Sequence, residues 1–149
     1  MIDIITVEKD QRNSQFVEKL LKVREDSVRA SHYFLTEEDI IGLTPQAEEA
    51  LRCVEILWVM QDEQKIIGFM GVQECKIEML FLHPDYFRKG LGKVFVERAF
   101  CELNVKYVDV NEQNPNAIQF YEKMGFRTFK RNERDSEGNL FPILEMKKN

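Results

Sequence analysis

The chain has 149 residues, a length that predicts one domain over residues 1–149 with one hydrophobic core. Apolar residues make up 44% and charged residues 32% of the chain, a balance that excludes extended disorder and is ordinary for a soluble surface. The formal net charge is −5 at pH 7 and the basic residues are dispersed, which argues against nucleic acid as a partner.

The N-terminal third predicts one strand and then helices. Residues 2–7 have the character of a short strand, and apolar residues recur at helical spacing between charges from Ser14 to Val28, which indicates a surface helix. Thr36 precedes three acidic residues, as a helix N-cap does. A second helix is therefore expected from Glu37 to Arg52, interrupted near Pro45 if the proline breaks it.

The apolar pattern changes period after this helix. The runs EILWVMQ (55–61) and IIGFMGVQ (66–73) flank the polar segment DEQK, a pattern typical of a strand hairpin. IEMLFL (77–82) predicts a third strand, helical spacing resumes from residue 91 to residue 103, and KYVDV (106–110) predicts a further strand. The last three segments form a βαβ unit, whose strands should be parallel with a right-handed crossover.

The C-terminal segment predicts a short helix and two strands. The helix covers residues 114–124, and the strands cover residues 126–130 and 140–146, joined through SEGN. The fold class is therefore α/β with a mixed sheet.

The cysteines and histidines bear on compartment and metal binding. Cys53, Cys75 and Cys101 lie far apart without zinc or redox spacing, so we expect free thiols in a reducing compartment. No apolar run approaches the ~20 residues of a membrane span, and the N-terminus lacks signal-peptide features, so we expect a cytoplasmic protein without a membrane partner. His32 and His83 have no metal-ligating partner at useful spacing, and we expect no metal.

The stretch FRKGLGKVF, between the third predicted strand and the helix that follows it, is a candidate phosphate loop. Gly90 and Gly92 would let the backbone approach a diphosphate at the helix N-terminus, and Arg88, Lys89 and Lys93 would add cations. The alternative is that the glycines serve only the loop and its packing while the cations are solvated. Neither GxxxxGK[ST] nor GxGxxG is present.

A second segment, NPNAIQFYEKMGF, makes the interpretation specific. Asn114, Ala117, Tyr121, Gly125 and Phe126 stand at the intervals of NxxAxxxYxxxGF. Together with the glycine loop, this resembles the GCN5-related N-acetyltransferases, the GNAT superfamily, whose cofactor loop is [QR]xxGx[GA]. SHYFL, VNEQN and RDSEGNLFPIL resemble the YjaB-type branch of that superfamily. The chain departs from the family loop at one position, where Phe87 replaces Gln or Arg.

The resemblance implies a fold and a cofactor site. The fold is a mixed, mostly antiparallel central sheet with helices on both faces, in which two parallel strands diverge at the acetyl-CoA site. Acetyl-CoA is the implied co-substrate. The residues expected to bind it are Leu80 and Leu82 of the strand, Arg88, Lys89, Gly90, Leu91, Gly92 and Lys93 of the loop, and Asn114 and Ala117 downstream.

Acetyl transfer to an amine needs a base for the ammonium and an acid for the leaving thiolate. Tyr121 occupies the position of the family's general acid, although it would also suit a packed core. Glu78 is the candidate base, because a carboxylate inside IEMLFL is anomalous, and strict alternation places it on the face of Leu80 and Leu82. The alternatives are that Glu78 merely meets water at a strand start, that a water chain is the base, or that Glu74 is.

The acceptor side is less defined by the sequence. The connection between the first two helices covers the acceptor site in the resembled fold, so Ser31, His32 and Phe34 are candidates beside Asn111, although each also suits an ordinary packed turn. The expected function is acetyl transfer to a primary amine of a small molecule, peptide or protein. The alternative is a non-catalytic CoA-binding or regulatory module. The expected oligomeric state is a monomer or a homodimer.

Overall fold

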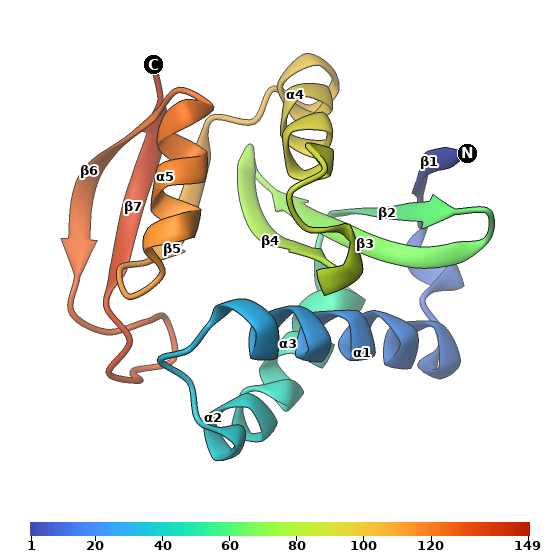
Figure 1. Ribbon diagram of the computed structural model, residues 1–149, viewed down its shortest axis with the longest axis horizontal. Helices are drawn as coiled ribbons and strands as arrows, with labels where there is room; N and C mark the ends of the chain where they lie inside the picture. The colour runs from blue at the N-terminus through green and yellow to red at the C-terminus, as the bar shows by residue number, and fades with distance from the viewer.

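The computed structural model describes all residues, 1–149, as seven strands, five α-helices and two short 3₁₀ helices (Figure 1). The strands are β1 (Ile2–Thr6), β2 (Ile56–Asp62), β3 (Lys65–Gln73), β4 (Lys76–Leu82), β5 (Tyr107–Asn111), β6 (Phe126–Asn132) and β7 (Ile143–Lys148). The helices are α1 (Ser14–Ser31), α2 (Glu37–Gly42), α3 (Thr44–Cys53), α4 (Leu91–Leu103) and α5 (Pro115–Lys123), with 3₁₀ turns η1 (Lys9–Gln11) and η2 (Pro84–Tyr86).

The seven strands form one sheet in the order β1-β2-β3-β4-β5-β7-β6. Only β4 and β5 are parallel, and every other neighbouring pair is antiparallel, which confirms the predicted mixed sheet and the βαβ unit. The parallel pairing is short, since only Lys76↔Tyr107 and Ile77↔Val108 are in register. Beyond these two pairs the strands part, and Figure 1 shows β4 and β5 diverging between α4 and α5.

Helices cover both faces of the sheet, as the family resemblance implied. On one face Phe95, Val96 and Ala99 of α4 and Tyr121 of α5 pack with β-strand residues in a cluster of 15 buried side chains. On the other face, a cluster of 10 buried residues joins α1 and α3 to β2 and β3. The second cluster is confined to the N-terminal half of the sheet, so β5, β7 and β6 have helix cover on one side only.

Two buried arginines hold the N-terminal helices without a carboxylate partner. Arg12 donates to four backbone carbonyls, three of them at the end of α3 (Leu51, Arg52 and Val54, at 2.7–3.3 Å). Arg24 donates to the carbonyl of Ile40 and to Thr44 Oγ1. Burial lowers the pKa of both guanidinium groups. The partial negative charge at helix C-termini compensates for the missing acid in both cases.

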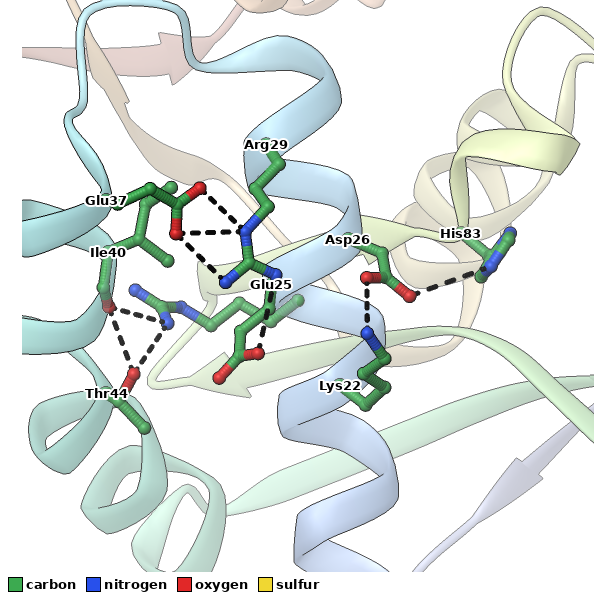
Figure 2. Close-up of polar contacts among 9 residues, drawn as sticks. Lys22, Glu25, Asp26, Arg29, Glu37, Ile40, Thr44 and His83 are labelled. Carbon is green, nitrogen blue, oxygen red and sulfur yellow. Dashed lines mark hydrogen bonds and ion pairs between the residues drawn. The ribbon is translucent and has the colours of Figure 1, made fainter.

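Charged contacts fix α1 at a third and a fourth point (Figure 2). Arg29 pairs with Glu37 at the start of α2 and with Glu25 one turn back on α1. Asp26 pairs with Lys22 and lies 3.9 Å from Nε2 of His83, so α1 passes next to the connection that follows β4.

The structure confirms one predicted break and corrects one predicted boundary. The segment expected to be helical from Glu37 to Arg52 is interrupted near Pro45, because Pro45 lies in the first turn of a new helix, α3, where its missing N–H costs nothing. The strand expected from residue 140 begins at Ile143, because the Asp135 side chain accepts from two backbone N–H groups and holds the preceding residues in a turn. The predicted N-cap at Thr36 is confirmed as a capping box with Asp39. No helix is long and apolar enough to cross a bilayer.

Candidate active site

A cleft of about 180 Å³ opens where the parallel strands separate. The last register pair is Ile77↔Val108, and the next residues along each strand, Glu78 and Asp109, both line the cleft where it begins. We call this place the fork. The lining residues are His32, Ile77, Glu78, Met79, Leu80, Phe81, Val108, Asp109, Val110, Asn111, Asn114, Ala117 and Tyr121. The cleft thus joins β4, β5, the start of α5 and the end of α1.

A β-bulge places Glu78 at the fork. On β3, Gly71 pairs with Met79 and Val72 pairs with Ile77, which leaves Glu78 without a partner. The predicted alternation is therefore wrong at this point: Ile77 shares the α4/α5 face with Leu80, three residues on, while Met79 packs on the opposite face. The extra residue turns a carboxylate out of the strand ladder and toward the cleft, which strict two-residue alternation could not show.

Glu78 has an environment suited to holding a proton. No ion pair or side-chain hydrogen bond engages its carboxylate. Partial removal from water raises the pKa of the Glu78 carboxyl above its ordinary value, the Lys76 ammonium opposes that rise, and Asp109 adds to it. Glu78 is nevertheless exposed, so this raised proton affinity belongs to a carboxylate that an incoming substrate can reach.

Tyr121 presents a phenol to the cleft from a packed setting. The residue is 7% exposed, and its ring packs edge-on against Phe120 and Phe126, with ring centroids 5.0 and 5.6 Å away. Burial raises the pKa of the phenol, and no side-chain hydrogen bond offsets this. The hydroxyl therefore stays protonated at neutral pH, and its hydrogen is free to be donated.

A hydrogen-bond network joins α1 to α5 across the cleft. The Ser31 hydroxyl donates to the carbonyl of Ser27 (2.7 Å) and lies 2.8 Å from His32 Nδ1. His32 Nε2 lies 3.4 Å from Asn114 Nδ2, and Asn114 Oδ1 accepts from the backbone N–H of Ala117. The Ser31 hydroxyl hydrogen and the Asn114 side-chain oxygen are both used in other hydrogen bonds. The tautomer of His32 that fits therefore carries its proton on Nδ1, which donates to the Ser31 oxygen, and accepts at Nε2 from the Asn114 amide.

His32 is neutral in this arrangement. Burial, with a smaller contribution from the Arg24 charge, lowers its pKa to about 4. Its ring also contacts Phe34 (centroids 5.5 Å apart) and Phe81 (6.4 Å), and Phe34 in turn meets Phe141 of the segment before β7. Of the predicted acceptor residues, His32 and Asn111 line the cleft, Ser31 orients His32, and Phe34 lies one layer further out.

The glycine loop lies next to the cleft rather than inside it. Gly90 has a left-handed backbone (φ +76°) and precedes α4, whose first N–H groups receive no side-chain cap. A Cβ on Gly92 would come within 3.3 Å of the Phe120 ring and 4.0 Å of Leu82. Gly92 therefore has a packing role, and the uncapped helix start retains free donors of the kind that bind phosphate.

The structure brings most of the predicted cofactor residues into one continuous strip. Leu80, Asn114 and Ala117 line the cleft, Leu82 continues from it toward the glycines, and residues 88–93 follow around the start of α4. Sequence reasoning missed one residue, Asp109. Its signal was available, since KYVDV places a carboxylate inside an apolar strand just as IEMLFL does.

Comparisons with known proteins agree with this geometry. Residues 54–128 match the family model described as the acetyltransferase (GNAT) domain. The chain is 35% identical over 137 residues to the peptidyl-lysine N-acetyltransferase YjaB of Salmonella typhimurium, covering 87% of this chain and 89% of that one. It is 34% identical to the Escherichia coli protein of the same name, covering 87% and 88%.

Solved structures show the same fold. The solution structure of apo-form YjaB from Escherichia coli superposes with a TM-score of 0.84 at 32% identity, over 99% of this chain and 97% of that one. The PaiA N-acetyltransferase of Thermoplasma acidophilum, crystallised with coenzyme A, has a TM-score of 0.72 at 20% identity, over 100% and 99% of the two chains. The second likeness concerns the fold alone.

Proposed function

Since the chain belongs to the GNAT acetyltransferase family and is an N-acetyltransferase that uses acetyl-CoA, we propose that its acceptor is the ε-amine of a lysine side chain in a protein. The observation that carries this proposal is the fork, where the Glu78 and Asp109 carboxylates line the cleft. An ammonium at the end of a long apolar stem can reach such a site. The two relatives at 35% and 34% identity are both named as peptidyl-lysine N-acetyltransferases.

The residues of this chain also fit the donor. Bound acetyl-CoA supplies an acetyl thioester. Its diphosphate suits the uncapped start of α4, where Gly90 and Gly92 leave the backbone accessible and Arg88, Lys89 and Lys93 provide positive charge. The backbone of β4 near Leu80 and Leu82 is free to pair with the pantetheine arm, because β5 has already parted from it. The thioester then lies beside Tyr121 and Glu78.

Each catalytic residue has one proton to move. A lysine ammonium with a pKa of ~10.4 is almost fully protonated at pH 7, so Glu78 accepts a proton to give the neutral amine. The amine nitrogen attacks the thioester carbonyl, a C–N bond forms and the C–S bond breaks. Tyr121 donates its phenolic proton to the departing sulfur, and the second proton lost by the nitrogen restores the phenol. The acetylated lysine, CoA–SH and one proton, carried by Glu78 and then released, are the products.

The test is a thiol-release assay with acetyl-CoA and a matched set of acceptors. The key peptide has a blocked N-terminus and one internal lysine, and its control carries arginine in place of that lysine. Peptides with a free N-terminus and no lysine, free lysine and polyamines complete the panel. Mass spectrometry of the products locates the acetyl group. We expect turnover of the internal-lysine peptide and none of its arginine control.

Other outcomes would contradict the proposal in recognisable ways. Turnover of free N-termini or small amines alone would move the acceptor to another amine class. Thermal stabilisation by acetyl-CoA without thiol release on any acceptor would favour the non-catalytic CoA-binding module instead.

A further inference from the structure

A row of four charged residues crosses the uncovered face of the sheet at the level of the fork. Lys76 of β4 pairs with Asp109 of β5 (Nζ to Oδ2, 2.5 Å), and Glu145 of β7 lies directly opposite Asp109 in the antiparallel register. Lys130 of β6 is the register partner of Glu145 and its ion-pair partner at 3.7 Å. Across the four strands, the row therefore has a cation at each end and two anions in the middle.

The row is built so that each anion has its own cation. Like charges directly opposite each other on neighbouring strands repel, and Asp109 and Glu145 are such a pair. Lys76 relieves Asp109 on one side, while Lys130 and Asn132 (Nδ2 to Oε2, 2.7 Å) relieve Glu145 on the other. Glu78, two residues after Lys76 on the same strand, is the one carboxylate at this level that has no partner.

We propose that Lys76 and Asp109 are positioning residues that set, in opposite directions, how readily Glu78 takes the proton of the acceptor ammonium. The proposal rests on the proposed function, in which Glu78 is the base. Lys76 places a positive charge near Glu78, which favours its carboxylate form, and Asp109 holds the Lys76 ammonium at the fork. Asp109 itself repels the carboxylate form, so the pair tunes Glu78 from both directions.

No other charged side chain at the fork competes with this pair. The β3 residues beside the bulge are Gly71 and Val72, and the α5 and α1 residues of the cleft are Asn114, Ala117, Tyr121 and the neutral His32. Glu145 acts through Lys76 and Asp109, because it lies one strand further away. The proton affinity of Glu78 therefore depends on two named residues that can each be altered.

The direct test does not need an acceptor. The side-chain carboxyl carbon of Glu78 is followed by NMR through a pH titration in the wild-type protein, in Lys76→Gln and in Asp109→Asn. Lys76→Gln removes the favourable charge and leaves Asp109 unpaired, so the Glu78 titration should move to higher pH. Asp109→Asn removes the repelling charge, so it should move to lower pH. Glu78→Gln identifies the resonance.

A matched control separates this effect from a general loss of charge. Lys106→Gln removes an exposed lysine immediately before β5 that forms no ion pair, and the Glu78 titration should stay where it is in wild type. Shifts of opposite sign in Lys76→Gln and Asp109→Asn are a signature that a merely structural ion pair would not produce. Unmoved titrations in both, with the fold intact, would overturn the proposal whatever the acceptor proves to be.

The catalytic readout follows with any acceptor that the wild-type protein uses. In a plot of kcat/KM against pH, the acidic limb should move in the same direction as the NMR titration of Glu78 in each variant, because that limb reports the ionisation of the essential base in the free enzyme. In Lys76→Gln, kcat/KM should fall below the wild-type value on the acidic side of the pH profile and return to it at high pH. NMR shifts without a change in the limb would show that Glu78 is tuned but is not the base, which would overturn the catalytic part.

Discussion

Replacement of Tyr121 by phenylalanine tests the assignment of the general acid with little disturbance to the fold. The variant keeps the ring that packs against Phe120 and Phe126 and deletes only the hydroxyl. That hydroxyl has no side-chain hydrogen-bond partner, so its removal leaves no buried group unsatisfied. The free energy of unfolding should change by less than about 1 kcal/mol, and acetyl-CoA affinity should be close to wild type.

Turnover should respond very differently from stability. A positioned acid contributes about 10²–10⁴-fold, so kcat of Tyr121→Phe should fall within that range, which corresponds to ~3–5 kcal/mol of transition-state stabilisation. The loss should appear in kcat and in kcat/KM alike, because the proton is transferred only in the transition state. Water that delivers the proton in place of Tyr121 would reduce the loss toward the lower end of the range.

The assay is steady-state thiol release with the best acceptor of the panel, accompanied by single-turnover measurements that establish whether chemistry limits the rate. Tyr33→Phe is the matched control, because it is the same substitution at a residue that is 83% exposed. A wild-type kcat in Tyr121→Phe, with chemistry limiting, would refute the reasoning and make Tyr121 a packing residue.

Five further variants test other parts of the site. Gly90→Val and Gly92→Val should weaken acetyl-CoA binding strongly, the first through backbone strain of about 1–2 kcal/mol and the second through a clash with the Phe120 ring. Lys89→Ala should weaken it mildly. If calorimetry finds wild-type affinity in both glycine variants, the diphosphate does not bind at this loop. Phe87→Gln restores the family residue and should leave affinity unchanged or tighter, whereas a tenfold loss, about 1.4 kcal/mol, would show that the loop is misaligned. The pKa of His32 is about 4 in the folded protein and ~6.5 in the unfolded chain, so the unfolded chain binds the proton more readily. The free energy of unfolding should therefore fall by up to about 3 kcal/mol as the pH drops from 6.5 to 4. His32→Gln should flatten that part of the curve in denaturant titrations, and an unaltered slope would mean that His32 is not held neutral.

The local elements of this protein were determined by the sequence alone. The helix start at Thr36 depends on hydrogen bonds within four residues, and it formed as predicted. The spacing of the apolar residues along the chain likewise predicted the strand hairpin, the βαβ unit and the helix that carries Tyr121. Two spaced motifs then identified the family, because their residues recur at the intervals typical of that family, and the match to the family model confirmed it. All of these features depend on neighbours in the chain.

The tertiary structure decided how the site is assembled. The bulge at Glu78 arises from how β4 pairs with β3, and a pattern within one strand holds no record of the register of its partner. The hydrogen bond between His32 and Asn114 joins residues 82 apart, and the fork exists only because β4 and β5 pair for two residues and then separate. The sequence placed Asp109 inside a predicted strand, but its position near Glu78 at the fork was set by long-range strand pairing that only the folded chain makes.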